Sequence, residues 1–327
     1  ATSPYIEDAI RPHIAGTFAD LLTQAVTHPL MLQYLDQDRA MGPSSPRALK
    51  KGKVAGLNEN LAREVLELHS LGVDGPYTQD DVRQLAELLT GLSFAPNSGA
   101  KFRKDYVEPG AETVLGKTYP DRASKGPVRQ VLQDLGKHPA TARHIARKLA
   151  VHFVSDTPDP MLVEDLTASF LATDGDLMAV YATLLDHPTA WAAPARNIKQ
   201  PEEFIGSALR ALAVPAGRMQ DLTEKQTKQM FYRWLTLMGQ TWQRPLGPDG
   251  WSEEDGDWIT PQGLSARVRW AMTVPERLLE LLPDPRAFVQ TALGGEAPPE
   301  VVFAASAAES RAEAIGLVLV SPAFQRR

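Results

Sequence analysis

The densest group of side chains that could do chemistry lies in LNENLAREVLELHSLG, residues 57–72. Carboxylates can act as general bases, an arginine can position an anionic group, and a histidine can transfer protons near neutral pH. These residue types would suit a hydrolase-like reaction in which a carboxylate is the base. The candidate catalytic residues are Glu59, Arg63, Glu64 and Glu67, and the candidate binding residues on the same segment are Asn60 and His69.

The same spacing also fits a purely structural role. On a helix, Glu59, Arg63 and Glu67 fall on one stripe at intervals of four residues, and Asn60 and Glu64 form the adjacent stripe. If the stripe is exposed, each ion pair contributes only a few tenths of a kcal/mol. If it is buried, one arginine cannot neutralise three glutamates, so a second cation, a bound proton or a metal is needed. The sequence leaves both alternatives open.

Motifs for metal, nucleotide or nucleophilic chemistry are missing from the sequence. There is no cysteine, no HExxH or HxH pair, no P-loop, no G-x-G-x-x-G and no G-x-S-x-G. We therefore predict no metal site, and the sequence names no cofactor.

A third set of candidates is aromatic. Trp242, Trp251 and Trp258 lie in a stretch rich in Gly, Pro and Asp at 239–261, which is too long for a simple connection. Exposed indole faces could stack on a sugar, so carbohydrate binding is one hypothesis for these candidate binding residues. The alternative is that they hold a long loop against the core.

Composition excludes some partners. The chain has 327 residues, 43% of them hydrophobic and 23% charged, which is ordinary for a globular protein. Its net charge of −6 argues against nucleic acid as the main partner. The longest apolar runs are too short for a transmembrane segment. The lack of cysteine is compatible with the cytoplasm and with export.

Helical periodicity dominates the chain and predicts an all-α fold. We expect a large multi-helix domain with a small β-hairpin insertion at about 94–126, turning at Pro109-Gly110, and the long Trp/Gly/Pro-rich loop. Residues 1–205 would form a helical core, and 206–327 a C-terminal helical part packed on it. Beyond the motif helix and a helix capped by Thr78, helices are expected at about 127–136, 138–155, 160–173, 175–187, 201–213, 222–239, 261–282, 285–294 and 308–319.

One short pattern recurs between these helices. In VTHPLML, GKHPATA, LDHPTAW and LVSPAFQ, a His or Ser precedes a proline at the start of a new helix. Proline suits the first helical turn and disfavours helix in the residue before it. The pattern therefore predicts helix breaks at His28, His138, His187 and Ser321.

Taken together, the motifs resemble the bacterial Domain of Unknown Function 1800 family. The resemblance rests on LNENLAREVLELHSLGVDGPYTQDDVRQLAELLTG and continues through EPGAETVLGKTYP, HPATARHIARKLAVHFVSD and MGQTWQRPLGPDGW to the terminal SPAFQRR. Residues Asn58, Glu59, Asn60, Arg63, Glu64 and Glu67 match the family's densest motif, and Gly239, Gln240, Pro245, Gly250 and Trp251 match its C-terminal loop.

Two departures from the family stand out. The chain is expected to lack the family's N-terminal segment, which contains an aromatic motif. Relatives also often carry a histidine and a lysine in the hairpin where this chain has Val107 and Glu112. If the histidine and the lysine do chemistry in relatives, this protein has lost it, and if the segment is only a turn, nothing has changed.

The resemblance implies a mostly helical bacterial protein whose activity is not established. Its relatives' genes often neighbour those of exported sulfatase-like proteins. We therefore expect an exported or cell-envelope accessory or binding protein that works with a sulfatase-like partner, in the periplasm or otherwise outside the cytoplasm, with a cytoplasmic location as the alternative. The rival hypotheses are the hydrolase built on the 58–71 helix and carbohydrate binding by the tryptophan loop.

Overall fold

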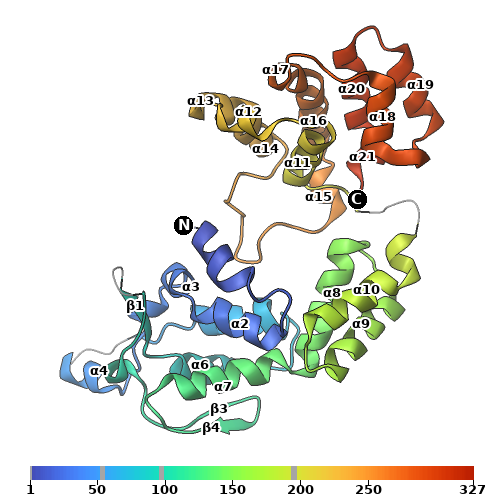
Figure 1. Ribbon diagram of the computed structural model, residues 1–327. Coiled ribbons are helices and arrows are strands. Elements are labelled where there is room, and N and C mark those ends of the chain that lie inside the picture. Colours follow the sequence, from blue (N-terminus) through green and yellow to red (C-terminus); the bar gives the residue numbers. More distant parts are fainter. Residues whose placement is uncertain (1, 52–55, 96–98, 193–196) are drawn as a thin grey trace. The chain divides into compact units, whose positions relative to one another are not determined.

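Helices form most of the chain, which confirms the expected all-α fold class (Figure 1). The computed structural model describes residues 2–51, 56–95, 99–192 and 197–327. Within these residues the strands form only two short antiparallel pairs. No helix in the described part of the chain is both long and apolar enough to cross a membrane.

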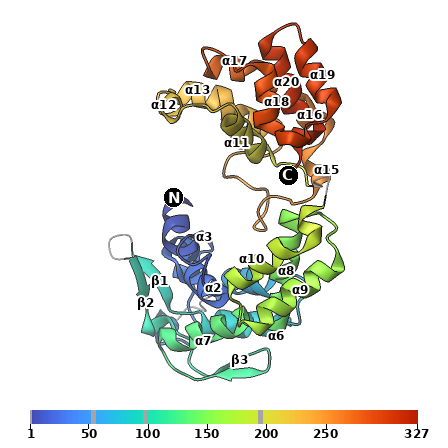
Figure 2. The same cartoon turned by 45° about the vertical axis from the view of Figure 1, so that its right-hand side comes forward.

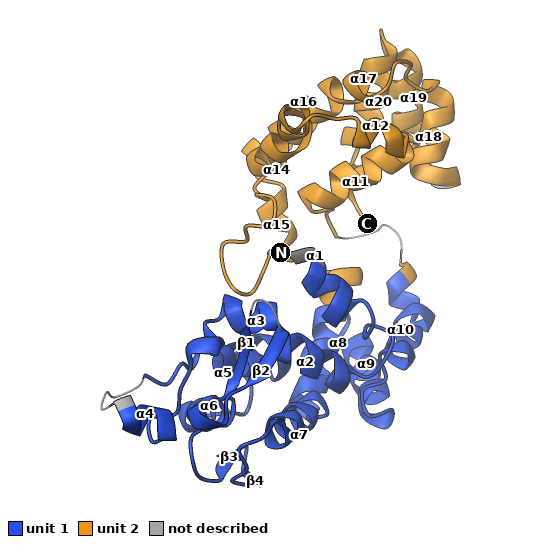
Figure 3. Cartoon of the chain, turned by 60° about the vertical axis from the view of Figure 1, so that its left-hand side comes forward, with its two compact units in different colours: residues 1–150, 158–190 blue, residues 151–157, 191–327 orange. Residues whose placement is uncertain are grey.

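The chain divides into two compact units (Figure 3). Unit 1 contains residues 1–150 and 158–190, and unit 2 contains residues 151–157 and 191–327.

Unit 1 combines helices with both strand pairs. Its elements are α1 (Thr2–Tyr5), η1 (Ile6–Ile10), α2 (Phe18–Thr27), α3 (Pro29–Tyr34), η2 (Gln37–Arg39), α4 (Pro46–Lys51), α5 (Asn60–Glu64), η3 (Val65–Ser70), α6 (Gln79–Leu88), β1 (Leu92–Ala95), β2 (Gly99–Phe102), η4 (Lys104–Tyr106), β3 (Glu112–Val114), β4 (Lys117–Tyr119), α7 (Lys125–Gly136), α8 (Pro139–Phe153), α9 (Pro160–Ala172), α10 (Leu177–Asp186) and η5 (Pro188–Trp191). The last residues of α8 and η5 belong to unit 2. Helices α8, α9 and α10 lie side by side (Figures 1 and 2).

Helix α2 packs along α7, and one glycine allows the close approach. A Cβ on Gly136 would lie only 2.5 Å from the Cα of Ala19, so no larger residue fits without moving one of the two helices. The buried face of α2 includes Leu22 and Val26, and that of α7 includes Val131. This helix pair forms one wall of the cavity described below.

The β insertion consists of two hairpins. Strand β1 pairs with β2, and β3 pairs with β4 with Val114 opposite Lys117. The turn expected at Pro109-Gly110 is wrong: those residues precede β3, and the β3–β4 turn is Leu115-Gly116, both at positive φ. A two-residue turn of the Leu115-Gly116 kind needs positive φ at both residues, and proline cannot take the first position because its ring fixes φ near −65°.

The expected helix breaks are confirmed, and the residue before each proline caps the helix that follows. The Nδ1 atoms of His28, His138 and His187 accept backbone N–H bonds from residues two positions later. Ser321 does the same through Oγ, which accepts from Phe324. These polar residues are therefore satisfied by local helix-start geometry.

Unit 2 is built around a buried tryptophan. Trp270 is fully buried, contacts Phe204 edge-on at 5.3 Å between ring centroids, and donates to the Met230 carbonyl at 2.9 Å. The helices of this unit are α11 (Pro201–Ala211), α12 (Ala216–Gln220), α13 (Glu224–Thr227), η6 (Lys228–Tyr232), α14 (Arg233–Leu237), α15 (Asp255–Trp258), α16 (Pro261–Thr273), α17 (Pro275–Leu278), α18 (Pro285–Leu293), η7 (Gly294–Glu296), α19 (Pro299–Ala307), α20 (Arg311–Val320) and α21 (Pro322–Gln325).

Several elements of unit 2 differ from the expected helices, among them α17 and α19. The helix expected at 261–282 is divided at Pro275, which lacks the N–H that an uninterrupted helix would use. Helix α19 was not expected at all, because its apolar residues surround the helix instead of forming one stripe.

Candidate functional site

As expected, Glu59 and Glu67 flank Arg63 at the helix formed by α5 and η3. Arg63 donates from Nη1 to Glu67 at 3.0 Å and from Nη2 to Glu59 at 3.5 Å. Gln79 of α6 joins this network, because it accepts from Arg63 at 2.9 Å and donates to Glu59 at 3.0 Å. The guanidinium is therefore engaged by three side chains. The Arg63 side chain is 42% exposed, which makes this a surface network.

The other polar residues of this helix differ from one another in burial and in charge. Asn60 is exposed, and its backbone N–H is capped by Asn58 Oδ1 at 2.9 Å. Glu64 is half-buried. Burial and the nearby charge of Lys148 lower the pKa of His69 to about 4, so its imidazole is neutral at physiological pH. None of these polar residues lines either hollow described below.

The helix changes its winding midway. Segment η3 is π-helical, with the Leu71 N–H donating to the carbonyl of Leu66 five residues earlier. Ser70 Oγ donates to the Val65 carbonyl at 2.6 Å in the same segment. A π-turn inside a helix is energetically poorer than an α-turn and is often found at functional positions.

The three candidate tryptophans do not present a common face. Trp258 is 4% exposed and donates from Nε1 to the Ser252 carbonyl at 3.0 Å, so it holds the loop in place. Trp251 contacts Trp258 edge-on, with 6.2 Å between the ring centroids. Trp242 stacks on Tyr232 at 5.7 Å. The three indoles therefore belong to two separate aromatic pairs and do not form one flat surface on which a sugar could stack.

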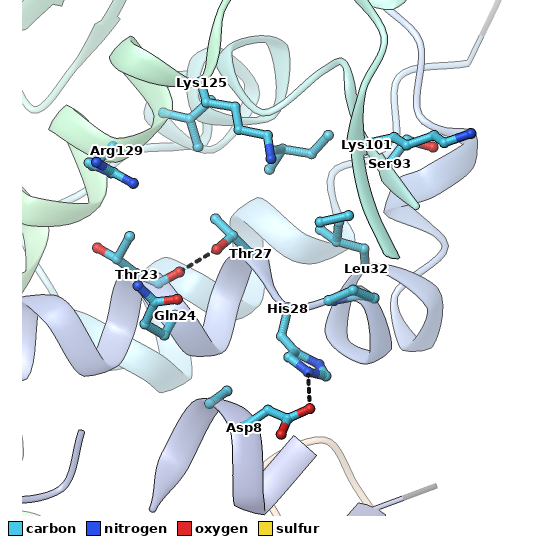
Figure 4. Close-up of a pocket in the computed structure, with 15 residues that line it drawn as sticks. Asp8, Thr23, Gln24, Thr27, His28, Leu32, Ser93, Lys101, Lys125 and Arg129 are labelled. Carbon is cyan, nitrogen blue, oxygen red and sulfur yellow. Dashed lines mark hydrogen bonds and ion pairs between the residues drawn. The ribbon is translucent and has the colours of Figure 1, made fainter. Parts of the chain in front are cut away.

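A cavity of about 270 Å³ lies in unit 1, between α2, α3, α7, η1 and the β1–β2 hairpin (Figure 4). Its charged and polar lining residues are Asp8, Thr23, Gln24, Thr27, His28, Ser93, Lys101, Lys125 and Arg129. Its apolar lining residues are Ala9, Pro29, Leu32, Leu92, Ala100 and Val128. Lys125 and Arg129 lie across the cavity from His28 and Asp8 (Figure 4).

The hydroxyls that line this cavity differ in their hydrogen bonding. Ser93 is 1% exposed, and its Oγ is closed to solvent and has no hydrogen-bond partner in the structure. Leaving a buried hydroxyl unpaired costs about 1–3 kcal/mol, so such groups normally have a partner. By contrast, the Thr23 and Thr27 hydroxyls are satisfied by carbonyls of their own helix at 2.8 and 2.7 Å.

The charge around the cavity is positive. Lys125 and Arg129 come from the first two turns of α7, whereas the ammonium of Lys101, on β2, extends away from them (Figure 4). Cations are unfavourable at a helix N-terminus, where the macrodipole is itself positive, and the first turn of α7 has no acidic residue. An anion bound there would be stabilised by both the side chains and the helix dipole.

His28 and Asp8 form the opposite side of the cavity. His28 Nδ1 accepts the Leu30 N–H at 3.2 Å, and its Nε2 lies 3.9 Å from Asp8 Oδ2.

A second, water-sized hollow of about 20 Å³ is lined by Glu87, Glu108 and Glu112 together with Tyr119 and Arg122. Glu87 and Glu112 are each 8% exposed. Burial, followed by the charge of Glu87 and a hydrogen bond to it, raises the pKa of Glu112 to about 7. Glu112 therefore keeps its proton to a higher pH than an exposed glutamate does. In the part of the chain that the structure describes, no three His, Asp or Glu side chains are arranged to hold a metal ion.

Comparison with known proteins identifies the family. The model of the protein family of unknown function DUF1800 matches residues 1–326, essentially the whole chain. The chain belongs to the DUF1800 family. No curated protein and no solved structure shows significant similarity to it.

In this DUF1800 protein, the acidic helix can be recognised from the sequence, whereas the cavity cannot. The helix residues are neighbours in sequence, whereas the cavity is lined by residues from position 8 to position 129. One local signal was available: Lys125 and Arg129 flank the start of the helix predicted at about 127–136, where acidic residues are preferred. Ser93 carried no signal, because its burial depends on the tertiary structure.

Proposed function

We propose that this protein is an accessory binding protein that holds a small oxyanion-bearing ligand in the cavity of unit 1. The observation that carries the proposal is the pair of cations Lys125 and Arg129, which line the cavity from the start of α7, where the first turn has no acidic residue. A sulfate, phosphate or carboxylate group would pair with these cations.

The acidic helix supports a binding role better than a hydrolytic one. A general base must be able to reach a substrate proton, and an arginine that positions substrate must have donors to offer. The Arg63 guanidinium already contacts Glu59, Glu67 and Gln79. We infer that this network fixes α6 against the α5–η3 helix.

We further propose that the protein acts in the cell envelope together with an exported sulfatase-like partner. The family resemblance implies this partner, and an oxyanion-binding cavity would give the two proteins related ligand chemistry. Affinity purification from the native host tests the proposal. The sulfatase-like protein should be retained with the tagged chain in the exported fraction, and its absence there would refute the partnership.

Direct titration tests the anion site. Calorimetry with sulfate and with phosphate should show binding to the wild-type protein, and Arg129→Glu should weaken it at least tenfold. Lys104→Glu is the matched control, because it makes the same charge change at an exposed position of unit 1 outside the cavity lining. If neither anion binds, or if both variants weaken binding equally, the proposed function is wrong.

A further inference from the structure

We propose that the outer surface of the α9–α10 helix pair is a docking site for a basic amphipathic helix of a partner protein. Both helices belong to unit 1, and they pack side by side (Figures 1 and 2). None of their residues lines the anion cavity, so helix binding at this surface would not depend on the proposed anion. Three properties of the surface lead to the assignment: its apolar residues, their spacing and its charge.

Both helices are apolar on their outer faces as well as on their inner ones. Leu166 of α9 and Val180 of α10 are fully buried inside the unit. A helix that is apolar all round is normally covered on every side, and exposed apolar side chains that cluster mark interaction sites. The outer faces carry four large apolar side chains that are between 44% and 57% exposed: Met161, Leu171, Met178 and Leu185.

The exposed apolar residues recur at the intervals that a second helix contacts. On α10, Met178, Ala182 and Leu185 occupy positions i, i+4 and i+7, and all three are exposed. On α9, the exposed Met161 and Ala168 are seven residues apart. Residues at these intervals share one face of a helix, and an amphipathic partner helix binds to such stripes through its own apolar face. The methionines suit a binding surface because their flexible side chains adapt to the partner.

The charged residues of this surface are negative. Residues 158–190 contain six Asp or Glu and no Lys or Arg, so the charge of this segment alone equals the net charge of −6 of the whole chain. Asp174 is paired with Lys137 at 3.5 Å. Glu164 and Asp186 are exposed, and neither forms an ion pair with another residue that the structure describes. Lysine or arginine side chains on a partner would complement these carboxylates.

The charge also favours a partner protein over a second copy of this surface. In a symmetric dimer that used this patch, the same residues would face one another across the interface. Glu164 and Asp186 would then approach carboxylates of the other copy, and like charges placed together oppose association. A helix with an apolar stripe flanked by basic residues covers the apolar side chains and pairs with the acidic ones. Helix α9 has 13 residues, so a partner helix of about 14 residues would match its length of about 20 Å.

Three synthetic peptides of about 14 residues test this docking site. The first has leucine at i, i+3, i+4 and i+7 and lysine elsewhere, the second has the same composition without an apolar face, and the third has glutamate in place of lysine. By fluorescence anisotropy, the full chain should bind the first peptide at least tenfold more tightly than either of the others. Equal binding of the first two would show that charge alone attracts the peptide and would overturn the proposal, as would a lack of binding.

A double variant of α10 locates the site. Met178→Ala with Leu185→Ala should weaken binding of the first peptide at least fivefold and leave Tm nearly unchanged, because both side chains are more than half exposed. The matched control is Leu246→Ala with Leu281→Ala, at exposed positions of unit 2, which should leave the affinity unchanged. If the α10 variant binds as tightly as the wild type, the surface is not the docking site.

Two further measurements test the charge and the identity of the partner. Glu164→Gln with Asp186→Asn should weaken binding of the first peptide at least threefold in low salt and by less in 1 M salt. No weakening would refute the role of the carboxylates. Sedimentation of the full chain without peptide should show no association that depends on this surface. If the chain dimerises and Met178→Ala with Leu185→Ala disrupts the dimer, a second copy covers the surface and the proposal is wrong.

Discussion

Replacing Glu112 with glutamine should change how the stability of this protein depends on pH. The unfolded chain has a glutamate pKa near 4.5, whereas burial and the neighbouring Glu87 carboxylate raise the pKa of Glu112 to about 7 in the folded protein. The folded state therefore holds the proton more tightly than the unfolded state. Consequently the folded state loses stability as the pH rises from about 4.5 to about 7.

The size of the stability loss follows from the pKa shift of Glu112. One pKa unit corresponds to about 1.36 kcal/mol, and access of solvent to the hollow screens part of the total, so we expect a loss of roughly 1–2 kcal/mol. Glu87 accepts hydrogen bonds from Arg83 at 3.2 Å and from Gln84 at 3.1 Å, which stabilise its charged form. A glutamine at 112 can donate to that carboxylate at any pH.

Urea unfolding at pH 5 and pH 8 provides the assay. The difference in unfolding free energy between Glu112→Gln and the wild type should be roughly 1–2 kcal/mol more in favour of the variant at pH 8 than at pH 5. Glu164→Gln, at an exposed position of α9, is the control and should show no such change. If Glu112→Gln and the control have the same pH dependence, the pKa of Glu112 is not raised in the folded protein and the reasoning is refuted.

Two further predictions concern the scaffold around the sites. Gly136→Ala should destabilise the protein by about 1–3 kcal/mol, because the added Cβ would meet the Ala19 backbone at 2.5 Å. By the same urea assay, Gly206→Ala, where nothing lies within 4 Å, should be neutral or stabilising, and equal effects would contradict the close α2–α7 contact. Arg63→Met should lower stability by about 0.5–1 kcal/mol in low salt and by less in 1 M salt, because its ion pairs are solvent-exposed. A loss that salt leaves unchanged would show that the network is not a surface one.

The outcome of the sequence predictions depended on how far apart the interacting residues lie. The caps at His28, His138 and Ser321, the Thr78 capping box and the ion pairs of Arg63 were all predictable. Each involves residues within four positions of one another, so helix geometry alone fixes the contact.

The hairpin turn was a local contact that the sequence indicated wrongly. Pro109-Gly110 has the composition of a turn, but the strands pair around Leu115-Gly116. Which of two plausible turns closes a hairpin depends on which strand residues become buried, and Val114 and Tyr119 are the buried ones.

The family and the all-α class of this protein were determined by the sequence alone, because motif order and helical periodicity are properties of the chain. The ligand cavity was decided by the tertiary structure. Ser93 and Arg129 lie 36 positions apart, and only the packing of β1 and α7 around a shared hollow brings both into its lining. Likewise, the pKa of Glu112 is raised because folding buries it beside Glu87, and burial disfavours the charged form of a carboxyl group.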